Sequence, residues 1–443
     1  MNDARPSISP HLKKLIERRQ RLMGKAYRLF YEQPVHVVAG EGVWLHDSDG
    51  NKYLDVYNNV PHVGHCHPQV VEAISKQAQT LNTHTRYLHD LVLEYAGRLT
   101  AKFPDKLDIA MFACSGTEAN ELALRLARAR TGASGMIVTE HAYHGTSWAI
   151  AQITTCYESG EKRGDNIVTV PTPDSFRGLY ANDDLAADKY ADHLRMAIET
   201  LAQRGHQPAA FIVDTIFSNE GLPTVPPGYL QKAVAIVRKA GGLFVADEVQ
   251  PGFGRLGTHF WGFDSHGVVP DIATMGKPMG NGYPVSAVVT SEDVIDSFQQ
   301  DSHYFNTFGG TPVACAAALA VLDIVEQQEL QAKALETGNY LKEGLKQLAA
   351  DHRLIGDIRG TGLFLGIDLV RNFENHEPAV SETKKAVNLL RHNGVLIGST
   401  GQYDNVLKIR PPMVFSKNNA DLLLQKLRIV LGLLGGAHER KPG

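Results

Sequence analysis

The chain has 443 residues, long enough for two or three domains with a large buried core. Hydrophobic residues make up 43% and charged residues 21%, and the formal net charge of −4 gives no sign of a nucleic-acid-binding surface. No apolar run approaches the length that spans a bilayer, and no secretory signal pattern opens the chain. The four cysteines lie far apart without zinc spacing, which favours reduced thiols in a cytoplasmic protein.

The N-terminal segment is basic from Lys13 to Arg28, a composition found both in organellar transit peptides and in surface helices. Glu17 interrupts the positive charge, and the leucine and isoleucine residues of this segment have roughly helical spacing. The pattern therefore favours an amphipathic surface helix over residues 8–30.

A small antiparallel element is predicted next. Three short runs have the composition of strands, namely Val35–Val38, Val43–Leu45 and Tyr53–Val56. The segment Asp47–Asn51 is typical of a turn between the last two, because it is rich in Asp, Asn and Gly. A helix is expected to begin after Pro68, which suits the first turn of a helix.

Three histidines, His62, His65 and His67, lie close together just before this helix. Such a cluster could ligate zinc, but zinc sites usually add a ligand from elsewhere in the chain at a defined spacing. The sequence offers no evident partner of that kind. We therefore predict no metal site here.

Small residues at Ser115, Gly116 and Thr117 precede an alanine- and leucine-rich segment of helical character. The backbone N–H groups at a helix N-terminus carry partial positive charge and suit a phosphate. An ordinary helix cap has the same composition, because Ser and Thr are favoured at that position whatever the function. From these residues alone, both interpretations stay open.

Three apolar runs are typical of strands buried in a parallel sheet: Met136–Thr139, Ala209–Val213 and Leu243–Ala246. The second run ends in Asp214, and the third ends in two acids, of which the first is Asp247. Open α/β sheets bind ligands at the carboxyl ends of their strands, which makes the two acids after the third run candidates for a site. A turn that follows a strand would explain the same acids without any function.

Lys277 lies between glycines in a stretch that is poor in other charges. Pyridoxal phosphate chemistry needs a lysine amine for the Schiff base and a carboxylate paired with the pyridinium nitrogen. Asp247 could supply that carboxylate, because an adjacent opposite charge keeps the ring nitrogen protonated. A solvated loop lysine is the alternative interpretation of Lys277.

The segment DEVQPGFGRLGTHFWGFDSHGVVPDIATMGKPMGNGYP, residues 247–284, resembles the cofactor attachment region of class III aminotransferases and their relatives. The resemblance implies that pyridoxal 5'-phosphate is the cofactor, that Lys277 is the Schiff-base lysine and that Asp247 is the pyridinium partner. By the same resemblance, Val249 packs on the ring face and Gln250 hydrogen-bonds the ring hydroxyl.

The resemblance implies further parts of the cofactor site. Ser115, Gly116 and Thr117 match the loop that holds the cofactor phosphate, and Tyr143 matches an aromatic residue that stacks on the ring. Thr307 matches a threonine that reaches the cofactor phosphate of the neighbouring subunit. The resemblance therefore implies a homodimer, or a dimer of dimers, whose active sites are shared between chains.

The resemblance covers nearly the whole chain and implies the fold type I architecture of pyridoxal-phosphate enzymes, which is α/β. A large cofactor-binding domain with a mixed, mostly parallel sheet is expected over residues 66–320. A small α+β domain is expected from residues 1–65 together with 321–443. In this last third the composition predicts four strands, Ile355–Arg359, Leu363–Leu369, Val395–Ile397 and Val406–Ile409, after helices at Pro312–Glu326 and Glu329–Asp351.

The fold and cofactor leave the reaction open, because one scaffold hosts several chemistries. The runs YLDVYNNVPHVGHCHP, NTHTRYLHDLVLEYAGRL, PTPDSFRGLY and FNTFGGTPVACA resemble the ethanolamine-phosphate and 5-phosphohydroxy-L-lysine phospho-lyases of this family. These relatives eliminate phosphate from a phosphorylated amine, leaving an enamine that hydrolyses to aldehyde and ammonia. An ω-aminotransferase that uses a keto-acid acceptor is the first alternative, and a non-catalytic relative that keeps the fold for binding is the second.

One strand on the expected substrate side differs from the aminotransferase pattern. Many class III aminotransferases have Arg-x-Ala-Pro-Pro where this chain has Lys408 and Arg410 before the two prolines. A lysine point charge does not clamp a planar carboxylate as an arginine fork does. We therefore expect Lys408 or Arg410 to hold the substrate phosphate, with Arg86 and Asn58 as weaker candidates. Both basic residues could instead merely flank the strand.

Overall fold

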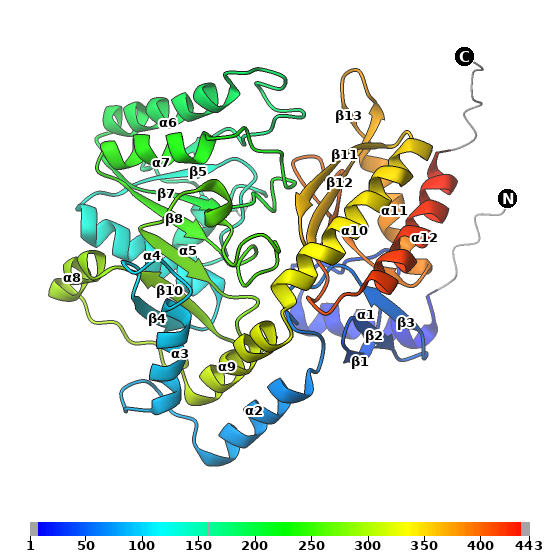
Figure 1. Cartoon of the computed structure of the whole chain (residues 1–443), viewed down its shortest axis with the longest axis horizontal. Helices are drawn as coiled ribbons and strands as arrows, with labels where there is room; N and C mark the ends of the chain where they lie inside the picture. Colours follow the sequence, from blue (N-terminus) through cyan, green and yellow to red (C-terminus); the bar gives the residue numbers. More distant parts are fainter. Residues whose placement is uncertain (1–7, 158–159, 436–443) are drawn as a thin grey trace.

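The structure is a computed structural model that describes residues 8–157 and 160–435. Figure 1 shows a large body built around one sheet with helices packed on it, beside a smaller body that contains both the first strands and the last helix of the chain. The segments at the two ends of the sequence therefore lie side by side. This arrangement fits the predicted domains 66–320 and 1–65 with 321–443, whose boundaries stay a prediction.

Helices and strands alternate along most of the described chain. The helices are α1 (Pro10–Met23), α2 (Pro68–Thr80), α3 (Asp90–Thr100), α4 (Gly116–Thr131), α5 (Trp148–Ile153), α6 (Ala186–Gln203), α7 (Tyr229–Lys239), α8 (Glu292–Asp301), α9 (Pro312–Gln327), α10 (Leu330–Asp351), α11 (Val380–His392) and α12 (Lys417–Leu434), with a short 3₁₀ helix at Phe263–His266. The strands are β1 (Val37–Glu41), β2 (Trp44–Asp47), β3 (Lys52–Asp55), β4 (Ile109–Ala113), β5 (Gly135–Thr139), β6 (Ile167–Val170), β7 (Pro208–Asp214), β8 (Leu243–Asp247), β9 (Ile272–Met275), β10 (Ser286–Thr290), β11 (Ile355–Thr361), β12 (Phe364–Asn372), β13 (Glu377–Pro378), β14 (Val395–Leu396), β15 (Gly398–Thr400) and β16 (Val406–Ile409).

The large sheet has seven strands in the order β4-β10-β9-β8-β7-β5-β6. Strands β5 to β9 run parallel, and β10 is antiparallel to both of its neighbours. The predicted strand Leu243–Ala246 is confirmed as part of β8 at the centre of this sheet, where helices cover both faces and an unbroken apolar run is stable. Helix α4 lies over one face, and α6 and α7 lie over the other.

The smaller body contains two further sheets. Strands β1, β2 and β3 form an antiparallel unit, and β14 from the last third of the chain pairs with β3 in parallel. The second sheet has the order β11-β12-β16-β15. Helix α9 joins the two bodies and is buried on almost every side, because its Ala- and Val-rich sequence packs against both cores.

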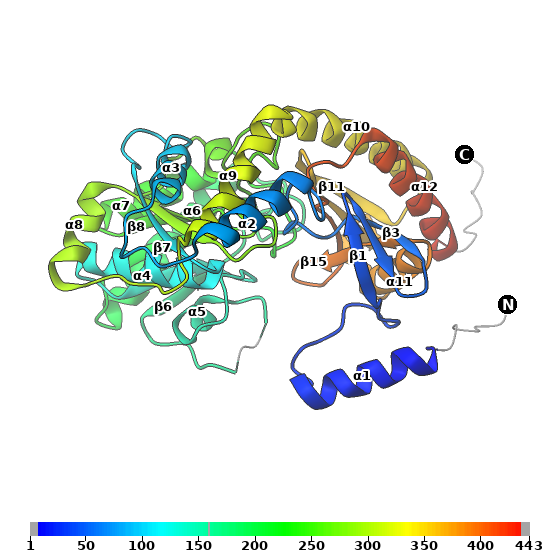
Figure 2. The ribbon, with the colours of Figure 1, turned by 90° about the horizontal axis from the view of Figure 1, so that it is seen from below.

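The N-terminal helix is shorter than predicted. It begins after the Ser9 cap and ends at Met23, whereas the sequence pattern predicted helix over residues 8–30. Gly24 ends it, with a φ of 74° that glycine adopts readily. No residue of α1 is buried against the described chain, and Figure 2 shows the helix set apart from the rest of the molecule. Among the described residues, the structure contains no helix that is both long and apolar enough to cross a bilayer.

Candidate active site

The carboxyl ends of the parallel strands bring charged groups to one edge of the large sheet. Asp214 at the end of β7 is in register with Asp247 at the end of β8, and Asp247 is in register with Thr274 of β9. Lys277 follows β9 by two residues. The strand order thus brings to one edge residues that are up to 63 positions apart in the sequence, as expected for ligand sites of open α/β sheets.

A cavity of about 350 Å³ opens at this edge. A larger cavity of about 520 Å³ lies elsewhere, but His266 is the one titratable side chain in its described lining, and this ring is bonded to the carbonyl of Thr215. The smaller cavity is the better candidate, because it gathers both charge signs. Eight predicted site residues line it: Ser115, Gly116, Thr117, Tyr143, Asp247, Val249, Gln250 and Lys277.

The N-terminus of α4 forms one wall of this cavity. The Ser115 hydroxyl caps the helix by accepting from the N–H of Glu118 at 3.2 Å. Gly116 begins the helix, and a Cβ atom placed there would lie 2.9 Å from Cγ1 of Val249. Glycine is therefore required for this close approach, and it leaves backbone N–H groups bare where an anion can reach them.

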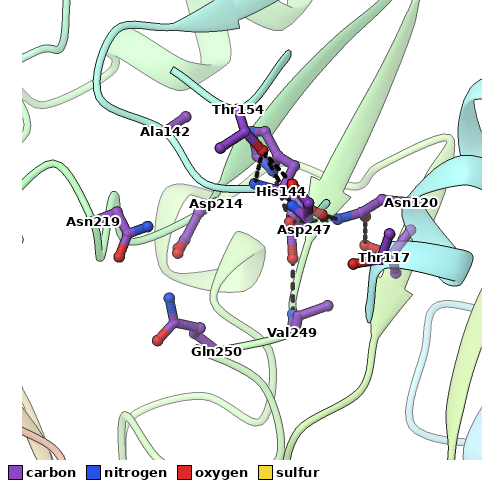
Figure 3. A network of polar contacts seen from close by, with 12 residues as sticks. Thr117, Asn120, Ala142, His144, Thr154, Asp214, Asn219, Asp247, Val249 and Gln250 are labelled. Atoms are coloured by element: carbon purple, nitrogen blue, oxygen red, sulfur yellow. Dashed lines mark hydrogen bonds and ion pairs between the residues drawn. The ribbon is translucent and has the colours of Figure 1, made fainter. Parts of the chain in front are cut away.

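The Asp247 carboxylate is held by three donors (Figure 3). Its Oδ2 lies 2.9 Å from Nδ2 of Asn120 and 2.7 Å from Nδ1 of His144, and its Oδ1 accepts from the N–H of Val249 at 3.1 Å. Both Asp247 and His144 are buried. Hydrogen bonds from three sides therefore fix the position of the carboxylate.

Lys277 lies in the same cavity, and the pKa of its amine is lowered. Loss of hydration, reinforced by the positive charge of Arg410, lowers the pKa of Lys277 from 10.5 to about 8, while Asp247 and Asp214 oppose the shift. A substantial fraction of the amine is therefore neutral near pH 8. A neutral lysine amine is both a nucleophile and a base.

Strand β16 brings two further cations close to the cavity. Lys408 is 3% exposed and Arg410 is 6% exposed. The ammonium of Lys408 donates to Oδ1 of Asn219 at 3.3 Å and to the hydroxyl of Thr400 at 3.5 Å. Burial and the charge of Arg410 hold the pKa of Lys408 well below its usual value.

The guanidinium of Arg410 is engaged by neutral groups. It donates from Nη1 to the side-chain oxygen of Gln250, and it lies 4.4 Å from the centre of the Tyr57 ring. The amide nitrogen of Gln250 in turn donates to the Ser218 hydroxyl at 2.6 Å. Arg410 therefore positions Gln250, which also lines the cavity.

No sequence-based prediction covered the loop that follows β7. Phe217 and Leu222 have φ of 52° and 51°, and between them Ser218 and Asn219 bond to Asp214 and Lys408 respectively. Left-handed conformations of bulky residues give no periodic sequence signal, so the direction of these side chains could not be predicted.

Glu220 in this loop is also buried beside the site. Its Oε1 accepts from the Thr139 hydroxyl at 2.8 Å, and its Oε2 has no hydrogen-bond partner. Burial, reinforced by the negative charge of Asp214, raises the pKa of Glu220 to about 7. Burial, reinforced by Asp247, likewise raises the pKa of Asp214.

Five predicted residues lie outside the described lining of the cavity in this single chain: Lys408 and Arg410, described above, and Thr307, Arg86 and Asn58. Thr307 is exposed, and so is Arg86, whose guanidinium lies 4.0 Å from the centre of the Phe305 ring. The backbone N–H of Asn58 donates to Asp55 at 2.9 Å. The roles predicted for Thr307, Arg86 and Asn58 therefore stay predictions.

Two of the three clustered histidines have separate partners. His62 is buried, and its Nε2 lies 2.9 Å from the carbonyl oxygen of Phe253. His65 lies 2.7 Å from the Asp55 carboxylate. These contacts give His62 and His65 structural roles in the turn that precedes α2.

The cavity has the donor set that pyridoxal phosphate requires. It combines an amine of lowered pKa at Lys277, an anchored carboxylate at Asp247 and a helix N-terminus without a side chain at Gly116. Tyr143 and Val249 add ring-sized apolar surface to the lining. These residues fit a cofactor that carries an aldehyde, a ring nitrogen and a phosphate.

Comparisons with known proteins agree with this geometry. The model of the family Aminotransferase class-III matches residues 29–431. An alanine–glyoxylate aminotransferase 2-like protein of Drosophila melanogaster is 42% identical over 93% of this chain and 86% of its own length, and ethanolamine-phosphate phospho-lyase homolog 1 of Caenorhabditis elegans is 38% identical over 95% and 93%. A solved phospholyase from Arthrobacter in complex with phosphoethanolamine superposes with a TM-score of 0.92 at 44% identity, covering 94% of this chain and 99% of that one. The chain belongs to the class III aminotransferase family, with the fold type I architecture predicted from its sequence.

Proposed function

We propose that this protein is a phospho-lyase that converts O-phosphoethanolamine and water into acetaldehyde, ammonia and inorganic phosphate. Its cofactor is pyridoxal phosphate, as in the family and its solved structures. When bound, the cofactor supplies an acceptor for the electrons released at the substrate carbon next to nitrogen. Phosphohydroxylysine is the second substrate of the same chemical class.

The observation that carries this proposal is the buried environment of Lys408. The side chain is almost fully buried, yet no carboxylate of the described residues forms an ion pair with it, and its two partners are neutral oxygens at 3.3 and 3.5 Å. Burial disfavours the charged form of this amine and a bound anion would restore it, so the retention of a lysine here favours a site for an anion that arrives with the substrate. A phosphate dianion fits that requirement.

Arg410 is the second proposed phosphate ligand, although Gln250 and Tyr57 already engage part of its guanidinium. An Arg410→Ala enzyme with unaltered phosphate-release kinetics would remove this residue from the proposal. Arg86 and Asn58 stay as weaker proposed ligands.

The proposed roles of the remaining residues follow from their places in the cavity. Lys277 would hold the cofactor through its amine and, once that amine is free, would remove the proton from the substrate carbon next to nitrogen, which its lowered pKa permits. Asp247 holds the proton on the ring nitrogen. The proposed cofactor contacts are the phosphate with Ser115, Gly116 and Thr117, the ring faces with Tyr143 and Val249, and the ring hydroxyl with Gln250.

We propose a homodimer, or a dimer of dimers, in which Thr307 reaches the cofactor phosphate of the partner subunit. Exposed hydrophobic side chains in the same segment as Thr307 support this proposal, since Phe305 is 41% exposed and Phe308 is 69% exposed. Large apolar side chains at this level of exposure are typical of surfaces that become buried in an assembly.

The comparisons support both the lyase and one alternative. The Arthrobacter phospholyase was solved with phosphoethanolamine and is 44% identical to this chain, which favours the lyase. Two relatives at 42% and 40% identity are named alanine–glyoxylate aminotransferases, which favours amino transfer to a keto acid as the second candidate.

The experiment that separates these candidates omits any keto acid. Purified, cofactor-loaded protein is mixed with O-phosphoethanolamine, and free phosphate and acetaldehyde are measured over time. A phospho-lyase releases both over many turnovers, whereas an aminotransferase without an acceptor stops after one half-reaction. No release from either O-phosphoethanolamine or phosphohydroxylysine, together with amino transfer to pyruvate, would establish the aminotransferase. Absence of cofactor absorbance even after addition of pyridoxal phosphate would instead point to a non-catalytic relative.

A further inference from the structure

Asn120 lines the cavity and links three of the elements around it. It is 1% exposed and lies on α4, one helical turn after Gly116. Its Nδ2 donates to Oδ2 of Asp247 at 2.9 Å and to the carbonyl oxygen of His144 at 2.7 Å, and its Oδ1 accepts from the Thr274 hydroxyl at 2.6 Å. Figure 3 shows Asn120 and His144 meeting at Asp247 from different elements.

The two oxygens of Asp247 are used unequally. Oδ2 receives Asn120 and His144, and a carboxylate oxygen has two lone pairs in its plane, so this oxygen is fully engaged. Oδ1 receives a single bond from the N–H of Val249 at 3.1 Å. The carboxylate therefore keeps one unused acceptor position, and that position is on Oδ1.

We propose that Asn120 is a positioning residue that fixes the rotation of the Asp247 carboxylate, so that Oδ1 receives the ring N–H of the cofactor. The amide is suited to this role because both of its amide hydrogens are used and its oxygen is anchored to β9. The same side chain ties α4, whose N-terminus faces the cavity, to the loop that carries Tyr143. It thereby fixes the distance between the residues that would hold the ring and those that would hold the phosphate.

The chain offers a matched control for this proposal. Asn405 is 2% exposed, and its Nδ2 donates to Oδ1 of Asp368 at 2.8 Å and to the carbonyl oxygen of Leu369 at 2.9 Å. This pair of bonds, to a carboxylate and to a backbone carbonyl, repeats the pair made by Asn120, but it lies away from the cavity lining. The variants Asn120→Ala and Asn405→Ala therefore remove equivalent bonds in two places.

Two properties of the holoenzyme test the proposal without any substrate, so the result does not depend on whether the enzyme is a lyase or an aminotransferase. We measure the dissociation constant of pyridoxal phosphate and the pH at which the visible absorption of the bound cofactor changes. Asn120→Ala is expected to weaken cofactor binding roughly 10- to 100-fold, the effect of one lost bond to a charged group, and to move the absorption transition. Asn405→Ala is expected to change neither.

A second variant keeps the shape of the side chain. Asn120→Asp places a carboxyl group against Asp247, so the two must share a proton, and the absorption transition is expected to move further than in Asn120→Ala. Asn405→Asp is its control. The proposal is overturned if both Asn120 variants keep the wild-type absorption transition, or if their changes equal those of the Asn405 variants, because the role of Asn120 would then be purely structural.

Discussion

The two sides of the cavity differ in how their buried charges are compensated. On the cofactor side, Asp247 accepts three hydrogen bonds from Asn120, His144 and Val249. Lys408 and Arg410, which lie outside the described lining and are proposed to hold the substrate phosphate, are equally buried but form no ion pair with the described residues. A carboxylate held by several donors suits a group that stays bound. A buried amine whose charged form is disfavoured suits an anion that comes and goes with each turnover.

The difference has an energetic meaning. Removing a charge from water without an ion partner costs several kcal/mol, so Lys408 is expected to destabilise the folded enzyme when no anion is present. Active sites commonly retain such groups because function requires them. The predictions below test the contrast between the two sides, beginning with the largest expected effect.

Substitution of Lys277, which is proposed to hold the cofactor and to act on the substrate, should have the largest effect. Lys277→Ala is expected to lower phosphate release by about 10²- to 10⁴-fold or more, because the general base is lost. The helix α4 N-terminus and Asp247 remain, so the variant should still retain cofactor without covalent attachment. Phosphate release and cofactor retention after dialysis are measured together. A variant that keeps more than a tenth of the wild-type rate would remove Lys277 from the mechanism.

Lys408→Met should separate function from stability. We expect kcat/KM for O-phosphoethanolamine to fall roughly 100-fold, equal to about 2.7 kcal/mol for a lost bond to a charged group. The melting temperature in phosphate-free buffer should rise, because a buried amine whose charged form is disfavoured is replaced by an apolar chain of similar length. Lys384→Met, at a site 73% exposed, is the control and should change neither. A loss of stability in Lys408→Met would contradict the proposal that Lys408 destabilises the enzyme when no anion is bound.

Thr307→Val tests whether a second chain completes the cofactor side. Loss of one hydrogen bond to the cofactor phosphate should weaken cofactor binding roughly 10-fold, or about 1.4 kcal/mol. Thr258, an exposed threonine elsewhere, provides the control variant Thr258→Val. Equal cofactor affinity in Thr307→Val, Thr258→Val and the wild type would argue against a shared active site.

The smallest effect is expected from Glu220→Gln, and it should depend on pH. The pKa of Glu220 is raised from 4.5 to about 7, so between these values the folded state keeps a proton that the unfolded state releases. Wild-type stability should therefore fall as the pH rises from about 4.5 to 7 through this group, whereas Gln cannot titrate. Urea unfolding at several pH values should show the variant gaining relative to wild type across this window. A constant difference would mean that Glu220 does not titrate there.

Patterns with a local cause could be predicted from the sequence. Leu243–Ala246 is an unbroken apolar run because β8 is buried on both faces, and the capping residues before α4 are small because Gly116 must approach Val249. Asp247 follows the β8 run at the edge where open α/β sheets bind ligands, and the structure adds Asp214 beside it.

Contacts between distant elements could not be predicted in the same way. Asn120 has no motif of its own within a helix, and its partner Asp247 is 127 residues away. Strands β4 and β10 were not predicted, and they close the antiparallel edge of the large sheet. The resemblance made Lys408 a candidate in advance. The absence of an ion pair between Lys408 and the described residues depends on packing between distant elements, so the sequence could not predict it.

The central contrast is tested most directly by melting cofactor-saturated enzyme at increasing concentrations of inorganic phosphate. Saturation with pyridoxal phosphate fills the proposed cofactor phosphate site, so any further effect reports a second anion site. Wild type should be stabilised as the phosphate concentration passes the dissociation constant, and Lys408→Met should not be. Equal stabilisation of both proteins, or of neither, would contradict the proposal that Lys408 holds the substrate phosphate.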